Sequence, residues 1–314
     1  MPPVEPPSAG FIVQLFVIPA VIVAIIVVVW ALFNWLAHTG SDPKAYVEAM
    51  KRDNESRWQA ASNLADVLRG PGNEEVKRDV ALLAELRSLL ESEMKAASYD
   101  DTPVTFRVYL CRAIGEFHLA DAMPPLVKAA VTERDERERE VRLAALQGIA
   151  RLIPNIPESR PRESKELRDA LLKAADDPST VVRYHGAYTL GVLGGPEAIA
   201  KLKSMLGDLG SVDVRMNAAT ALARYGEPEC VPELAKMIDP NETAGIDAEP
   251  QKELQKQKRM QILSNAFNAV RLFAEKAPSA DVKPIVDALD KLLASNPEPD
   301  VRLAAEDLKR TIEK

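Results

Sequence analysis

A ten-residue string recurs along this chain and restricts what the chain can fold into. Residues 141–150 read Val-Arg-Leu-Ala-Ala-Leu-Gln-Gly-Ile-Ala, residues 182–191 read Val-Arg-Tyr-His-Gly-Ala-Tyr-Thr-Leu-Gly, and residues 214–223 read Val-Arg-Met-Asn-Ala-Ala-Thr-Ala-Leu-Ala. Such self-similarity is the signature of stacked structural repeats, in which each repeat contacts mainly its neighbours. The sequence therefore predicts a stack of similar helix pairs and not one globular core.

The arginine of this string marks the repeat register. Matching arginines, spaced 32–50 residues apart, are Arg57, Arg107, Arg142, Arg183, Arg215, Arg259 and Arg302. They predict an all-α solenoid of about six to seven helix pairs over residues 54–314. Each arginine is expected at the start of a first helix, as part of a ladder of ion pairs and hydrogen bonds, because guanidinium stays charged and offers five donors. The carboxylates nearest in sequence, and so the expected partners, are Glu140, Asp213 and Asp300.

Residues 176–206 show how one repeat is built. A helix is expected to open at Asp177-Pro178-Ser179, because proline is tolerated in a first helical turn. The apolar residues that follow at helical spacing, and so are predicted to face inward, are Val182, Ala187, Leu190 and Leu193. Gly194-Gly195-Pro196 then breaks the chain, and a second helix is expected from about Glu197.

These strings resemble the HEAT-repeat family, in particular the short repeats first described in phycobilin lyases. The resemblance covers residues 102–239 well and residues 54–314 in outline. It implies a right-handed α-solenoid that acts as a protein-binding scaffold. It is confined to the repeat itself, and no separate signal for a bilin site accompanies it.

The N-terminal region has a different character. Residues 15–33 form an unbroken apolar run, and a bilayer core of roughly 30 Å needs about 20 apolar residues. We predict a Pro-rich tail over residues 1–10, a transmembrane helix over residues 11–37 and a juxtamembrane linker over residues 38–53. The alternative is a cleaved signal peptide, which fits less well because residues 1–10 carry no Lys or Arg and no Ala-x-Ala site follows.

The orientation of this anchor follows from the basic residues beside it. The tail before the apolar run has none, whereas Lys44, Lys51 and Arg52 follow it. The positive-inside rule therefore predicts a single-pass membrane protein with its large C-terminal domain in the cytoplasm.

Composition argues against several classes of function. The formal net charge is −7 with both signs interspersed, which does not favour nucleic-acid binding. The histidines His38, His118 and His185 have no partner at metal-ligand spacing, and no catalytic or phosphate-binding motif is present. Cys111 and Cys230 lie in different repeats and are expected to be buried thiols. We therefore expect no enzyme activity, no cofactor, no metal and no small-molecule substrate.

A binding surface is expected on the row of second helices, which we place on the concave side. Four lysines at matching positions there, which could meet an acidic peptide or helix, are Lys128, Lys173, Lys203 and Lys236. The sequence thus predicts a membrane-anchored HEAT-repeat scaffold that binds protein partners. The alternative is an accessory lyase or chaperone-like enzyme built on the same platform.

Overall fold

The computed structural model describes residues 10, 13–39, 42–52, 54–156 and 164–313, with side chains left undescribed for residues 34–39. The predicted tail over residues 1–10 lies almost wholly outside this range. Helices are the only regular elements in the described residues, and no strand occurs there. The all-α prediction is therefore confirmed.

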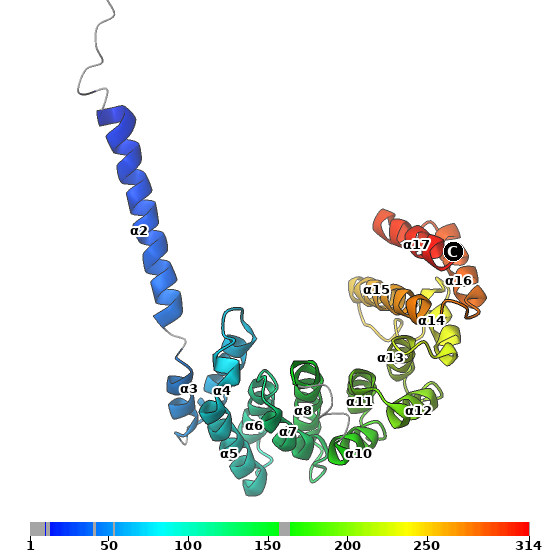
Figure 1. The fold of residues 1–314 in the computed structure, drawn as a ribbon, viewed down its shortest axis with the longest axis horizontal. Coiled ribbons are helices and arrows are strands. Elements are labelled where there is room, and N and C mark those ends of the chain that lie inside the picture. Colours follow the sequence, from blue (N-terminus) through cyan, green and yellow to red (C-terminus); the bar gives the residue numbers. More distant parts are fainter. Residues whose placement is uncertain (1–9, 11–12, 40–41, 53, 157–163, 314) are drawn as a thin grey trace, which may run out of the picture.

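The helices of residues 57–312 form two rows that follow a curved path (Figure 1). The inner row, on the concave side, consists of α4 (Arg57–Arg69), α6 (Asp101–Ile114), α8 (Glu138–Leu152), α11 (Thr180–Leu193), α13 (Val212–Ala223), α15 (Lys252–Lys276) and α17 (Pro299–Ile312). The outer row consists of α5 (Val80–Ala96), α7 (Met123–Ala130), α10 (Lys165–Ala174), α12 (Pro196–Met205), α14 (Val231–Ile238) and α16 (Lys283–Ala294). The described residues thus contain six helix pairs followed by α17, as the register arginines predicted.

The pair α11 and α12 forms for the reasons that the sequence gives. Val182, Ala187 and Leu190 are fully buried on one face of α11. Gly194 and Gly195 then adopt φ values of +71° and +90°, which side-chain-bearing residues rarely adopt, and so they end the helix. Pro196 starts α12, where its missing N–H costs nothing. Burial of such apolar faces between neighbouring repeats is the main stabilising contribution.

Small residues let the inner helices approach closely. An added Cβ at Gly115, at the end of α6, would lie only 2.3 Å from the Cα of Gly148 in α8. The backbones therefore touch at this crossing, and a side chain at Gly115 would have no room. This close approach lies within the inner row, which is on the concave side of the curve seen in Figure 1.

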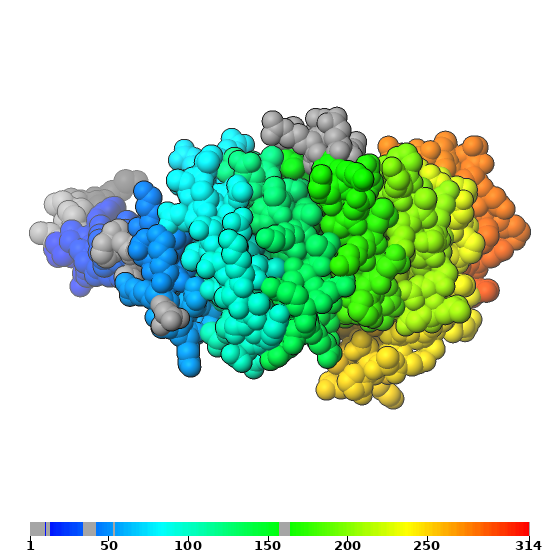
Figure 2. Space-filling model, turned by 90° about the horizontal axis from the view of Figure 1, so that it is seen from below, coloured from blue at the N-terminus to red at the C-terminus, as the bar shows by residue number. Residues whose placement is uncertain are grey.

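The outer face is a series of parallel bands in chain order, as Figure 2 shows. The segment that precedes and opens α15 projects from one edge of this stack (Figure 2). It belongs to the longest interruption of the repeat pattern, residues 240–257.

The region before the solenoid contains two helices. A helical segment over Val13–Phe33, formed by a π-helical start and the first part of α2 (Ile18–Thr39), is long and apolar enough to cross a membrane. All its described side chains are exposed, and a signal sequence would satisfy the same criterion. Residues 11–12 of the predicted span lie outside the described residues.

The prediction of a linker over residues 38–53 needs correction. Pro43–Met50 forms helix α3, capped by the Asp42 carboxylate, which accepts the Lys44 N–H. Val47 and Met50 are buried in the same core as the solenoid. Helix α3 packs on α4 and α5. It carries no copy of the repeat string, and for that reason the sequence did not predict it.

Candidate binding surface

The register arginines form a ladder along the inner row. Each of the first six donates a hydrogen bond to a backbone carbonyl at the C-terminal end of the preceding outer helix or of α3, as in Arg142 Nη1 to Thr132 O at 3.1 Å and Arg215 Nη1 to Asp208 O at 2.8 Å. Arg302 instead donates to the side chain of Asn296 at 2.7 Å. Helix C-termini carry partial negative charge and unpaired carbonyls, so a cation there is stabilising.

Four of these arginines also bind a carboxylate in or just after the outer helix of their own repeat, and that of Glu233 lies in the first turn of α14. The pairs are Arg57–Glu93 at 3.0 Å, Arg142–Asp177 at 2.7 Å, Arg183–Asp208 at 2.9 Å and Arg215–Glu233 at 3.4 Å. Arg142, Arg183 and Arg215 therefore each join two successive outer helices, and Arg57 joins α3 to α5. The predicted ladder exists, and its role is to hold the repeats together.

The partners predicted for the ladder were wrong. Glu140 pairs with Arg139, Asp213 pairs with Lys258, and Asp300 borders a cavity between α15 and α17. These carboxylates lie two residues before the register arginine, on a different face of the same helix. An arginine side chain instead reaches across to the outer row.

Arg107, Arg259 and Arg302 form no such ion pair among the described residues, and Arg107 is the most deeply buried of the three. Residues 128–132 read Lys-Ala-Ala-Val-Thr where residues 173–177 read Lys-Ala-Ala-Asp-Asp, so Thr132 stands where Asp177 supplies the carboxylate. The Arg107 guanidinium is fully buried, and its Nε and Nη2 have no hydrogen-bond partner among the described residues. Desolvation accordingly lowers the pKa of Arg107.

The four lysines of the predicted stripe lie on the outer row. They occupy α7, α10, α12 and α14, so the prediction that they line the concave side is wrong. Lys173 pairs with Glu133, Lys203 pairs with Glu227 and Glu229, and Lys236 pairs with Glu233. Lys128 is exposed. Three of the four charges are thus largely offset within the chain, and a role in binding stays a prediction.

Most of the exposed large apolar side chains outside the N-terminal helix lie instead on helices of the inner row. Beyond the N-terminal helix, the large hydrophobic residues that are exposed in the described part of the chain are Val80, Val181, Tyr188, Leu209, Leu254, Met260, Leu272 and Leu303. Six of these eight lie on α11, α15 and α17. Exposed apolar residues that gather on one side of a protein mark an interaction surface, whereas scattered ones do not.

The repeat register contains a signal for this surface that the sequence analysis missed. The residue after each register arginine is large and apolar or aromatic, in the order Trp58, Val108, Leu143, Tyr184, Met216, Met260 and Leu303. Of these, only Met216 is buried, and Leu303 is 65% exposed. One position of every repeat therefore contributes an apolar side chain to the same row of helices.

Aromatic rings on the inner row stack on one another and on arginine side chains. Trp58 stacks on Tyr109 with ring centroids 5.8 Å apart, and the Arg112 guanidinium lies 5.0 Å from the Tyr109 centroid. Arg224 lies in the same way 5.5 Å from the ring centroid of Tyr188. Flat, rigid side chains of this kind supply contact area at low conformational cost.

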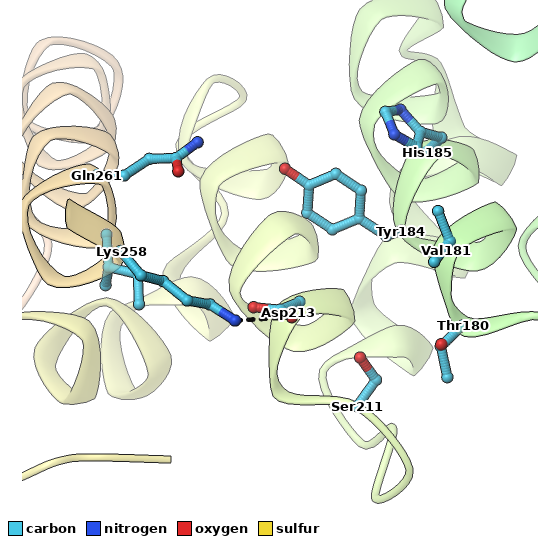
Figure 3. A pocket seen from close by; sticks show the side chains of 9 residues that line it. Thr180, Val181, Tyr184, His185, Ser211, Asp213, Lys258 and Gln261 are labelled. Atoms are coloured by element: carbon cyan, nitrogen blue, oxygen red, sulfur yellow. Dashed lines mark ion pairs between the residues drawn. The ribbon is translucent and has the colours of Figure 1, made fainter. Parts of the chain in front are cut away.

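A cavity of about 310 Å³ opens on the inner row between α11, α13 and α15 (Figure 3). Tyr184 points from α11 toward α13 and α15, and its ring meets the His185 ring edge-on at 5.0 Å between centroids. Asp213 lies at the opposite wall with Lys258, whose Nζ is 3.5 Å from its carboxylate. Burial raises the pKa of Tyr184, and the negative charge of Asp213 raises it further. Burial lowers the pKa of His185.

The two cysteines are not placed to act as reactive groups. Cys111 and Cys230 are free, buried thiols whose pKa burial raises to about 12. Thiols in such surroundings are poor nucleophiles. No cluster of His, Cys, Asp and Glu with metal-binding geometry occurs in the described residues.

The two curved rows of helices define the class of this protein as an α-solenoid of stacked helix pairs. A family profile described as HEAT repeats matches residues 134–212 and 168–246. The two matches together span residues 134–246, and the helices on both sides continue the same arrangement. The resemblance seen in the sequence is therefore confirmed.

A solved structure with a TM-score of 0.50 supports the same fold. The complex of CpcE and CpcF of phycocyanin lyase from Nostoc sp. PCC7120 is similar over 86% of this chain and 94% of that chain, with 21% identity and a TM-score of 0.50. A designed armadillo repeat protein aligns over 86% of this chain and 96% of its own, with 18% identity and a TM-score of 0.38. A comparison with curated protein sequences gives no match.

Proposed function

We propose that this chain is a non-catalytic scaffold, held at a membrane by its N-terminal helix, whose concave face binds an elongated segment of a protein partner. The observation that carries this proposal is the gathering of exposed apolar side chains on α11, α15 and α17. HEAT and armadillo repeats generally bind other proteins along an extended concave surface. The register arginines, which are the most chemically conspicuous side chains, are engaged in joining repeats.

Site-specific photo-cross-linking in cells tests the binding face. With a benzophenone amino acid in place of Met260, we expect discrete adducts with a partner protein. The same label in place of Lys128, on the outer row, should give few. The double substitution Val181→Asp and Tyr188→Asp should abolish the Met260 adducts, because charge in an apolar contact carries a desolvation cost. Equal labelling from both faces, or adducts that survive the double substitution, would contradict the proposal.

The orientation in the membrane has its own test. Because Lys44, Lys51 and Arg52 follow the apolar helix, we place the solenoid in the cytoplasm. A reporter enzyme that is active only after export should therefore be inactive when fused to the C-terminus. Substitution of all three basic residues by Gln should raise its activity. An active reporter on the unmodified chain would place the solenoid on the opposite side.

The second candidate is an accessory lyase built on the same platform. It is supported by the likeness in fold to the phycocyanin lyase subunits. A visible absorption band on the purified full-length chain would favour this candidate over the scaffold.

A further inference from the structure

The cavity between α11, α13 and α15 is lined by one acidic and one basic side chain, and a second carboxylate, Glu249, lies beside it. Lys258 is the one cation paired there within the described residues, and it is shared between Asp213 at 3.5 Å and Glu249 at 3.3 Å. Two carboxylates thus share one ammonium group. The Asp213 side chain keeps 48% of its surface exposed, so its carboxylate is accessible to a further ligand. A further cation would complete the pairing.

The walls of the cavity suit the rest of a basic side chain. Tyr184 contributes an aromatic ring, and the π-face of such a ring attracts cations. Val181, which is 48% exposed, and Ile262 contribute apolar surface that fits the methylene stem of lysine or arginine. Burial lowers the pKa of His185, which keeps that neighbouring ring uncharged near neutral pH.

We propose that this cavity binds a lysine or arginine side chain of the segment that lies along the concave face. The inference rests on the proposed scaffold function and specifies the chemistry of the partner. Arg224 stacks on Tyr188, one helical turn further along α11. The partner segment should therefore carry a single basic residue at the cavity and no second one beside it. A run of basic residues would meet this guanidinium and be repelled.

Peptide binding to the full-length chain in lipid nanodiscs tests the proposal. The probes are three fluorescein-labelled peptides of Ser, Ala and Leu that differ only in a central Lys, Glu or Leu, and the readout is fluorescence anisotropy. A cation–π contact and a partly exposed ion pair together correspond to about tenfold in affinity, so the Lys peptide should bind about tenfold more tightly than the Leu peptide. The Glu peptide should bind most weakly.

Asp213→Asn should remove most of this preference while circular dichroism stays unchanged. The matched control is Glu140→Gln, since Glu140 also lies in the first turn of an inner helix, two residues before its register arginine. It should keep the preference. A preference that survives Asp213→Asn, equal binding of the three peptides, or no binding of any would overturn the inference. Cross-linking from the Met260 position would be unaffected by those results, so failure of the scaffold proposal is distinguishable.

Discussion

Substitution of Asp177 by alanine is expected to lower the free energy of unfolding by about 3–5 kcal/mol. The Arg142–Asp177 pair is bidentate, at 2.7 and 3.2 Å, and its side chains are 5% and 1% exposed. Removing the carboxylate leaves a buried guanidinium without its counter-charge. The Asp177 carboxylate also accepts the Ser179 N–H at the start of α11, and this bond is lost too. Urea denaturation of the full chain, followed by circular dichroism, measures the change.

Two controls separate this burial effect from a general effect of charge. Glu140→Ala breaks the Arg139–Glu140 pair, whose side chains are 45% and 51% exposed, and should cost less than about 1 kcal/mol. The double substitution Arg142→Met with Asp177→Leu should restore much of the loss, because an apolar pair needs no desolvation. If Asp177→Ala costs no more than Glu140→Ala, the ladder does not hold the repeats together.

Much of the solenoid could be predicted because its information is local. The spacing of Val182, Ala187 and Leu190 is a property of one helix, and Gly194 ends that helix through its own φ preference. Because the string recurs, the helix pair derived for one repeat also applies to the neighbouring repeats. Even Arg57 and Arg259, whose surrounding strings match the repeat poorly, take the same place in the ladder.

The arrangement between helices was harder to predict because it depends on the packing of residues far apart in sequence. Helical spacing tells which side chains share a face, but it does not tell which row of helices becomes concave. Lys173 and Lys203 were therefore assigned to the wrong side. The cavity was missed for the same reason. Tyr184 and Lys258 line it together because the path of the solenoid turns at α13.

The second large effect is expected at Leu222, which is fully buried in α13. Leu222→Ala should lower the free energy of unfolding by about 2–5 kcal/mol, since it removes buried apolar surface and leaves a cavity. The matched control is Leu209→Ala in the preceding loop, where the side chain is 96% exposed and a change within about 0.5 kcal/mol is expected.

Hydrogen exchange on the Leu222→Ala variant shows how this loss spreads. In a solenoid each repeat is stabilised by its nearest neighbours, so the loss should loosen adjacent repeats before distant ones. Exchange should accelerate most over residues 180–240, where α13 contacts α11, α12 and α14. Residues 102–131, whose helices α6 and α7 pack mainly on α4 and α8, should be less affected. A uniform loss of protection over residues 54–314 would show that the chain unfolds as one cooperative core, and the description by independent repeats would then fail.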